Sequence, residues 1–219
     1  MVLVVRKTSL KLVLQWAQRV LAAGSIVLLG YCGFVLVDAW RFQHRERQRL
    51  ERLLHEAHAP KGPSAKSSAS TETTPVIGPA IGPDGLIGRM EIARLGVSVV
   101  VVEGTGNAVL RRAAGHIAGT GLPGHPGNVG IAGHRDTFFL PLRNIQPDDI
   151  ITLTTLRGEY RYRVVSTKVV GPFDVAVLNP DGNEILTLVT CYPFYFVGAA
   201  PERFIVRAER VIRSAGELP

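Results

Sequence analysis

A run of 18 uncharged, mostly apolar residues near the N-terminus constrains this chain more than any other feature. It covers residues 20–37 of the 219, with Trp16 before it and Trp40 after it. As a helix, such a run approaches the thickness of a bilayer core, and indole rings prefer the boundary between lipid tails and headgroups. The run predicts a single transmembrane anchor over residues 20–40. A cleaved signal peptide is the competing interpretation, although no clear cleavage site follows the run.

The formal net charge of +7 belongs mainly to the N-terminal part of the chain. Residues 1–86 carry 11 Lys and Arg against 6 Asp and Glu, whereas the remaining residues carry 14 against 12. A nucleic-acid-binding protein carries its basic surface on the folded domain, whereas a membrane protein carries it beside an apolar span. The distribution favours a membrane partner and argues against nucleic acid. Basic residues stand on both sides of the run, so charge does not decide its orientation.

Composition divides the rest of the chain into a helix, a linker and a β-rich domain. Residues 1–19 are predicted to be a cytoplasmic segment, and residues 41–85 a juxtamembrane helix followed by a linker rich in Pro and Ser. Leucines at helical spacing among alternating Arg and Glu predict the helix over residues 41–58, which we expect to be a solvated stalk. No core can form in the linker, so it predicts a tether for a domain at residues 86–219.

The domain at residues 86–219 consists of short β-like runs separated by turn residues, with one helix expected at residues 107–113. Alternation of side chains is clearest in the run that follows the turn at Arg157 and Gly158. Many short strands with few helices indicate a mainly β fold, either a closed barrel or a sandwich. The predicted strands cover residues 87–93, 97–102, 128–132, 149–156, 159–170, 184–190 and 203–211.

One of these strands delivers Cys191 to the start of an aromatic-rich loop. The other cysteine, Cys32, lies inside the apolar run, so Cys191 has no plausible disulfide partner. A lone cysteine often acts as a small buried hydrophobe, but at a strand end it is also a candidate nucleophile. An unperturbed thiol is mostly protonated at neutral pH, so a nucleophilic role requires a base or a cation nearby.

Three histidines of the domain are candidates for that base: His116, His125 and His134. His134 is the best placed, because it ends a short apolar strand beside glycines, where a side chain can face a cleft. Arg203 or Arg207 in the final strand could stabilise a developing oxyanion. Four residues apart on a strand, the two arginines face the same side, so alternation does not choose between them. Recognised metal-ligand spacings are absent, so neither a metal nor a cofactor is predicted.

Thr-Leu-x-Thr-Cys at Thr187–Cys191, Gly-His at Gly133–His134 and an Arg in the final strand together resemble the sortase family. A wider pattern looks most like its class D branch: Gly115-His116, Pro123-Gly124, Gly127-Asn128, Ala132-Gly133-His134-Arg135 and Thr190-Cys191-Tyr192-Pro193-Phe194. The resemblance implies a closed eight-stranded β-barrel with short helices, anchored in the cell membrane by one helix and facing the cell envelope. It further implies Cys191 as nucleophile, His134 as general acid and base, and Arg203 as the cation that stabilises oxyanion and substrate.

The activity that the resemblance implies is that of a cysteine transpeptidase. Such an enzyme cleaves a C-terminal sorting signal of the Leu-Pro-x-Thr-Gly type through an acyl-thioester and transfers the protein to an amine on a cell-wall peptide or a pilin-type lysine. Two alternatives stay open: a membrane-tethered cysteine peptidase that uses water, and a noncatalytic envelope-binding module. In relatives an acidic residue often stands in place of His125. Candidate substrate-binding residues are Thr190, Tyr192, Phe194 and His116.

Overall fold

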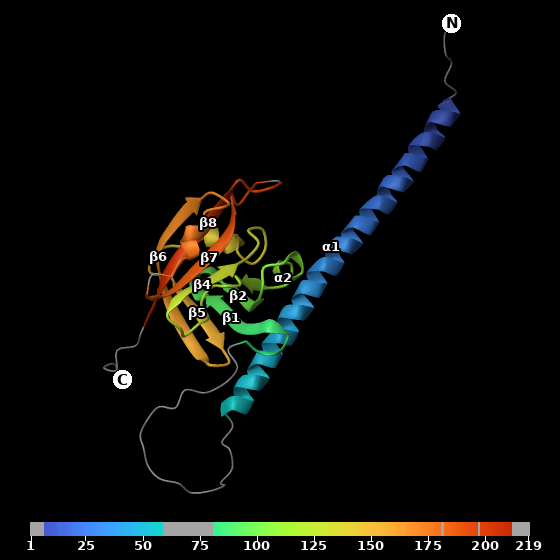
Figure 1. Ribbon diagram of the computed structural model, residues 1–219. Helices are drawn as coiled ribbons and strands as arrows, with labels where there is room; N and C mark the ends of the chain where they lie inside the picture. Colours follow the sequence, from blue (N-terminus) through green and yellow to red (C-terminus); the bar gives the residue numbers. More distant parts are fainter. Residues whose placement is uncertain (1–6, 59–80, 181, 197, 212–219) are drawn as a thin grey trace, which may run out of the picture. The chain divides into compact units, whose positions relative to one another are not determined.

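The computed structural model describes residues 7–58, 81–180, 182–196 and 198–211, which belong to two units (Figure 1). The first unit ends at Arg41 and contains the N-terminal part of helix α1 (Lys7–His58); the second begins at Phe42. Most of the predicted linker, at residues 59–80, lies outside the described residues. No proline interrupts the sequence from Lys7 to His58. The predicted anchor and juxtamembrane helix therefore form one continuous helix rather than two.

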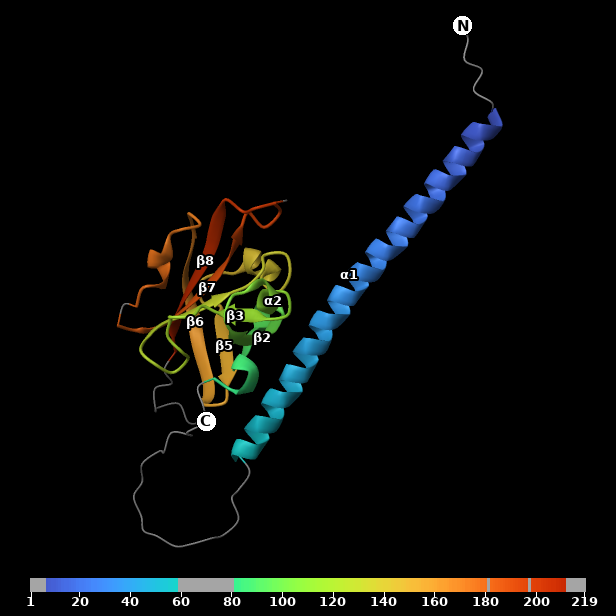
Figure 2. The ribbon, with the colours of Figure 1, turned by 45° about the vertical axis from the view of Figure 1, so that its right-hand side comes forward.

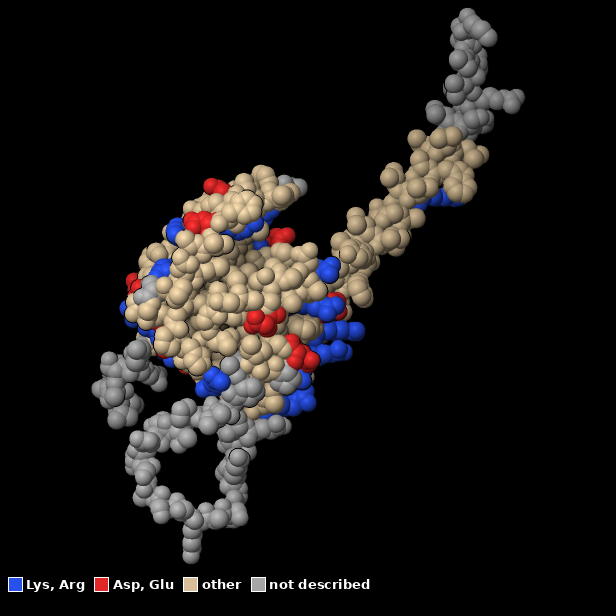
Figure 3. All heavy atoms as spheres, viewed as in Figure 1, with Lys and Arg blue, Asp and Glu red and all other residues tan. Residues whose placement is uncertain are grey.

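In the first unit, most large apolar side chains of α1 are exposed, as expected for a helix that lies in an apolar environment. Trp16 is 60% exposed and Trp40 is 63% exposed. Figure 3 shows this stretch of helix with few charged atoms on the visible side. By length and composition the helix can cross a membrane, and a signal sequence meets the same criteria. The described structure thus agrees with either use of the apolar run.

The second unit is built around a closed eight-stranded barrel, in the order β1-β2-β3-β4-β7-β8-β6-β5 (Figure 2). Pairs β2/β3 and β4/β7 are parallel, and the remaining pairs are antiparallel. The closed barrel is confirmed, and the sandwich alternative is wrong. The strands are β1 (Leu86–Ile92), β2 (Val97–Glu103), β3 (Ala114–His116), β4 (Gly127–Ala132), β5 (Ile150–Thr155), β6 (Gly158–Val170), β7 (Glu184–Tyr192) and β8 (Glu202–Arg210).

Two local predictions differ from the structure. The helix expected at residues 107–113 is the single turn α2 (Asn107–Leu110), and the chain then enters β3, which the sequence analysis missed. Strand β3 has only three residues, Ala-Gly-His, without the β-branched side chains that mark strands. It forms because β2 and β4 pair with its two edges. The remaining short helices are η1 (Pro83–Gly85), η2 (Ala93–Leu95), η3 (Leu140–Asn144) and η4 (Val175–Leu178).

Strand β2 is buried on both faces, which explains its run of consecutive valines. Val99 and Val101 belong to the core inside the barrel, whereas Val100 and Val102 belong to a second apolar cluster on the outside. Leu50 of α1 lies in that second cluster and is only 2% exposed. The part of α1 after Phe42 therefore covers the outer face of β2. The expectation of a solvated stalk is wrong for this segment.

Polar side chains of the same helix segment complete the free edge of β2. Strand β3 pairs with β2 only from Val101 onward. Before that point the amide side chain of Gln43 accepts a hydrogen bond from the Val100 N–H at 2.9 Å and donates one to the Arg112 carbonyl at 2.6 Å. Arg47 donates to the Ser98 carbonyl at 2.6 Å. The bond to Val100 is buried and the other two are partly buried, so Gln43 and Arg47 supply hydrogen-bond partners to backbone groups that the helix covers.

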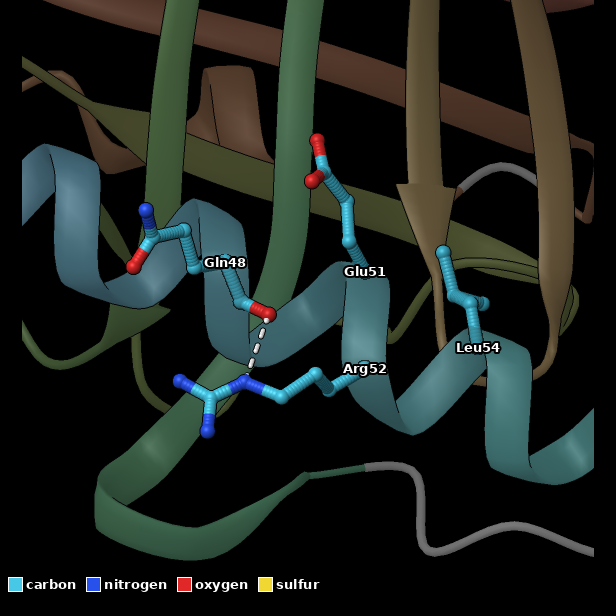
Figure 4. Close-up of a pocket in the computed structure, with 4 residues that line it drawn as sticks. All are labelled: Gln48, Glu51, Arg52 and Leu54. Carbon is cyan, nitrogen blue, oxygen red and sulfur yellow. Dashed lines mark hydrogen bonds between the residues drawn. The ribbon is translucent and has the colours of Figure 1, made fainter.

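The remaining exposed side of this helix segment carries its own polar contacts (Figure 4). Gln48, Glu51, Arg52 and Leu54 line a pocket there, and the Arg52 Nε–H donates to the Gln48 carbonyl at 3.3 Å. Glu51 lies 3.9 Å from Arg89 of β1, while Leu54 packs against the outer apolar cluster. The segment is therefore amphipathic, as its leucine spacing predicts, with the apolar side against the barrel.

Candidate active site

Strands β7 and β8 bring Cys191 and Arg203 together. In the antiparallel pairing of the two strands, Cys191 and Arg203 are direct cross-strand partners. Such partners have Cα atoms about 5 Å apart. Arg207 is the alternative that alternation left open. It is opposite Thr187, four residues before Cys191 in β7. The register thus separates the two arginines, and only Arg203 lies level with the thiol.

Strand β4 brings His134 to the other side of Cys191. Ala132 pairs with Val189 in the parallel β4/β7 ladder. The Gly133 N–H donates to the Val189 carbonyl at 3.1 Å, and the Thr190 hydroxyl donates back to the Gly133 carbonyl at 2.8 Å. His134 and Cys191 each stand two residues after the paired Ala132 and Val189, so the register brings the turn after β4 next to the end of β7 that carries Cys191. Cys191 therefore lies on the middle strand of three, between a histidine and an arginine.

The turn after His134 is fixed by close packing. The N–H of Phe139 donates to the His134 carbonyl at 3.2 Å, and the Phe139 side chain is fully buried. A Cβ atom added at Gly133 would lie 2.7 Å from the Phe139 ring, so only glycine fits there. This packing explains why a glycine precedes the histidine. It also shows that Phe139 serves the core rather than a peptide groove.

The three candidate catalytic side chains keep access to solvent. Cys191, His134 and Arg203 are all partly exposed, and the Cys191 thiol is free. One guanidinium nitrogen of Arg203, Nη1, donates to the Ala200 carbonyl at 3.2 Å and to the Glu202 carbonyl at 2.9 Å. These bonds hold the head group at the start of β8. A thiol, an imidazole and a fixed cation on adjacent strands are the parts required for acyl transfer through a thioester.

The predicted substrate-binding residues that follow or precede the cysteine have different environments. Thr190 is 2% exposed and ties β7 to Gly133, so its hydroxyl is already used inside the barrel. Tyr192, Phe194 and Phe204 form an aromatic cluster with ring centroids 5.3 to 6.3 Å apart. Phe194 and Phe204 also pack against the core. Contact of Thr190, Tyr192 and Phe194 with a substrate stays a prediction.

The other two histidines of the domain lie away from this arrangement. His116 is 3% exposed; its Nδ1 lies 2.7 Å from the Glu103 carboxylate and its Nε2 lies 2.8 Å from the Gly121 carbonyl. Both ring nitrogens thus meet partners from the chain itself, and the predicted role of His116 in substrate binding stays a prediction. His125 precedes the start of β4, at the opposite end from His134, and its Nε2 is 2.8 Å from Arg157.

An arginine for which the sequence predicted no role contacts the aromatic-rich loop that connects the cysteine to Arg203. Arg135, the residue after His134, donates to three carbonyls of this β7–β8 loop (residues 193–201), and Arg143 contacts Tyr195. One arginine among the fourteen basic residues of the domain carries no signal by itself. The one sequence signal that could have indicated a role for Arg135 is its position directly after His134. Among the described residues, no group of three or more His, Cys, Asp or Glu side chains could hold a metal ion.

Fold and site together define a closed β-barrel with the parts of a cysteine acyltransferase, and comparisons with known proteins give its family. The family model "Sortase domain" matches residues 90–211. Sortase D of Bacillus subtilis is 33% identical over 203 residues, which is 88% of this chain and 96% of that protein. The chain belongs to the sortase family and is a cysteine transpeptidase.

Solved structures agree with this assignment. A sortase D5 transpeptidase of Clostridium perfringens is 33% identical, with a TM-score of 0.53 over 58% of this chain and 79% of that one. Sortase A of Corynebacterium diphtheriae is 32% identical, with a TM-score of 0.56 over 60% of this chain and 63% of that one. The predicted resemblance to the sortases, and to class D among them, is confirmed.

Proposed function

We propose that this sortase cleaves a C-terminal sorting signal of the Leu-Pro-x-Thr-Gly type and transfers the shortened protein to an amine. The register of β4, β7 and β8 around Cys191 is the observation that carries the proposal. It supports Cys191 as nucleophile, His134 as general acid and base, and Arg203 as the oxyanion-stabilising cation. The acceptor amine belongs to a cell-wall peptide or to a pilin-type lysine.

The first half-reaction forms a thioester. The Cys191 thiolate attacks the carbonyl carbon of the signal's threonine, and the carbonyl oxygen takes the negative charge of the tetrahedral intermediate. The guanidinium of Arg203 stabilises that charge, because it is permanently cationic and held at the start of β8. His134 protonates the departing glycine nitrogen as the C–N bond breaks. The acyl group is then attached to sulfur.

The second half-reaction releases the product. His134, now neutral, removes a proton from the incoming amine, which attacks the thioester carbonyl. The C–S bond breaks, Cys191 leaves as a thiolate, and an amide joins the substrate to the acceptor. Water in place of the amine gives the free acid, which is the reaction of a cysteine peptidase.

We further propose that α1 is an uncleaved, single-pass anchor and that the barrel faces the cell envelope. In this division residues 1–19 are cytoplasmic, residues 20–40 span the membrane, residues 41–85 connect and residues 86–219 form the catalytic barrel. The exposed apolar surface of α1 supports the anchor, and the family match over residues 90–211 supports the barrel boundaries. A mass measurement of the mature, membrane-bound protein tests this: a chain that lacks the apolar run would contradict it.

A product analysis of the full chain in detergent micelles tests the activity. A fluorescent Leu-Pro-x-Thr-Gly peptide panel is incubated with triglycine or with a peptide that offers a lysine ε-amine. We expect an acyl adduct on Cys191 by mass spectrometry and a ligated product that increases with amine concentration. Cys191→Ala should form neither, while the matched control Cys32→Ala should match the wild type. Free acid alone at high amine would contradict the transferase, and absence of both adduct and cleavage would contradict the whole proposal.

A further inference from the structure

The residue after His134 reaches across to the loop that follows Cys191. The Arg135 guanidinium donates from Nη1 to the Pro193 carbonyl at 3.1 Å, and from Nη2 to the carbonyls of Phe196 at 2.6 Å and Gly198 at 3.0 Å. Its Cζ atom also lies 5.8 Å from the centroid of the Phe196 ring. One side chain thus joins three points of the β7–β8 loop to the turn that carries the histidine.

Besides Arg135, the described residues of the loop are held by Arg203, which donates to the Ala200 carbonyl at 3.2 Å, and by the contacts of Phe194 and Tyr195. Tyr195 is 79% exposed and Phe196 is 45% exposed, so much of the apolar surface of the loop lies outside the core. Phe194, near the start of the loop, packs against the core. Ordering an exposed loop costs conformational entropy at every residue, and charge-assisted hydrogen bonds are among the contacts strong enough to offset it. The planar guanidinium suits this task, because its donors have fixed directions.

A second arginine contacts the same loop from the next helical turn. Arg143 of η3 donates a hydrogen bond to the Tyr195 hydroxyl and lies 5.4 Å from the centroid of its ring. This contact is exposed, as are the bonds of Arg135 to Phe196 and Gly198, whereas the bond of Arg135 to Pro193 is partly buried. An exposed contact is weakened by water and contributes little. Arg135 is therefore the stronger connection of the two, because it bonds to three carbonyls and one of these bonds is partly buried, whereas Arg143 contacts only Tyr195.

We propose that Arg135 is a positioning residue for catalysis: it fixes the β7–β8 loop, and through that loop the alignment of Cys191 and Arg203 with His134. The loop joins the cysteine strand directly to the arginine strand. Arg135 lies next to the histidine in the chain, so one guanidinium couples all three catalytic groups. This proposal rests on the catalytic roles proposed above. Arg135 itself touches no reacting atom.

Turnover of the full chain in detergent micelles, on a fluorogenic Leu-Pro-x-Thr-Gly peptide, gives the first test. Arg135→Gln should lower kcat about 100-fold and leave KM within about threefold, because a displaced catalytic group slows chemistry more than it weakens peptide binding. Arg135→Lys should recover less than a tenth of the wild-type kcat, since a lysine ammonium lacks the planar group of N–H donors with fixed directions that bonds to the loop carbonyls. Arg143→Gln should lower kcat by less than about threefold, and Arg163→Gln, a surface arginine of β6, is the matched control for loss of charge.

Hydrogen exchange and alkylation test the same proposal without a sorting substrate. In Arg135→Gln and Arg135→Lys, the amides of residues 194–196 and 198–200 should exchange faster, while the amides of the strands should not. The pH profile for alkylation of Cys191 by iodoacetamide should also change in these two variants and in neither control. Failure of the wild type to process any peptide would reject the proposed function, yet these two readouts would still decide on Arg135.

Three results would overturn the proposal. The first is a normal kcat in Arg135→Gln. The second is a loss confined to KM, which would mean that Arg135 acts through peptide binding. The third is unchanged exchange in the loop. If Arg135→Gln unfolds as a whole, Arg135→Lys, which keeps the charge, decides the question by the same measurements.

Discussion

Polar side chains have different roles in two regions: the face of β2 that helix α1 covers, and the proposed catalytic end of β4, β7 and β8. Under the helix, Gln43 and Arg47 bond to backbone groups of the free strand edge, next to the fully buried Leu50. At the catalytic end, Cys191 and His134 are partly exposed, and their alignment comes from strand register. One region uses polar groups to complete the fold, and the other presents them to solvent.

The comparison teaches where substitutions should separate stability from activity. Groups that satisfy buried backbone atoms contribute to the free energy of unfolding, because their loss leaves an unpaired polar atom. Groups presented to solvent cost little to remove from the folded state, but they carry the chemistry. We therefore expect changes at the catalytic end to lower turnover in a folded protein, and changes under the helix to lower stability with little effect on turnover.

The largest expected effect is that of His134→Ala, with His125→Ala as its matched control. Loss of the proposed general acid and base should lower kcat about 10³-fold, since proton transfer by a positioned histidine contributes 10²- to 10⁴-fold. His125 lies at the other end of β4 beside Arg157, so its loss should leave kcat within about twofold. Both rates are measured on the full chain with the fluorogenic peptide. Equal losses of kcat in the two variants would contradict the proposal that only the His134 end of β4 takes part in catalysis.

Arg203→Ala and Arg207→Ala test the cross-strand register. Arg203 is opposite Cys191, so its removal should lower kcat about 10²-fold or more, the cost of one oxyanion donor. Arg207 is opposite Thr187, and its removal should change kcat by less than about threefold. Single-turnover measurement of acyl-enzyme formation reports the step directly. A greater loss of kcat in Arg207→Ala than in Arg203→Ala would show that Arg207, and not Arg203, is the oxyanion-stabilising cation.

Leu50→Ala tests the helix-covered face. Leu50 is 2% exposed in the outer apolar cluster, so its truncation should lower the free energy of unfolding by about 3 kcal/mol. The exposed Arg52 of the same helix gives the control, and Arg52→Ala should stay within about 0.5 kcal/mol. Thermal unfolding followed by the β-sheet circular dichroism signal measures both. Unchanged stability in Leu50→Ala would mean that this part of α1 contributes nothing to the barrel.

The smallest effect concerns Asp149, which carries a structural ion pair away from the site. The Arg94 guanidinium bonds to this carboxylate and, with the Gln146 N–H at 2.8 Å, holds the pKa of Asp149 below its ordinary value. Asp149→Asn should cost about 1.5 kcal/mol at pH 7, a modest figure because Arg94 is 46% exposed.

The pH dependence of that cost has a definite sign. A carboxylate whose pKa is lowered by folding stabilises the native state at pH above its unfolded value of about 3.9, and this contribution is lost as pH falls through the lower folded value. Unfolding of wild type and Asp149→Asn should therefore differ at pH 7 and converge in acid. A difference that grows below pH 4 would contradict the sign. Turnover at pH 7 should be the same in both folded proteins.

Much of the fold follows from local pattern, and particular residues show where local pattern fails. The alternation in residues 160–165 predicts β6, and burial in the strand does alternate from Tyr160 to Val164, since side chains of a strand at a sheet surface alternate between core and solvent. Strand β3 was missed because Ala-Gly-His has no such pattern and depends on the edges of β2 and β4. The solvated stalk was wrong for a related reason. Spacing identifies an apolar helix face, but the partner of that face is a distant strand.

For the site, the sequence by itself determined which residues have the chemistry and how far apart they lie in the chain: a cysteine at a strand end, a histidine after glycine, and two arginines in the last strand. Only the tertiary structure decided that Arg203 rather than Arg207 is level with Cys191. It also decided that Arg135 joins the turn after β4 to the β7–β8 loop, and that the part of α1 after Phe42 covers β2. The physical reason is that alternation is a property of one strand, whereas register is set between strands by packing and hydrogen bonds across the barrel.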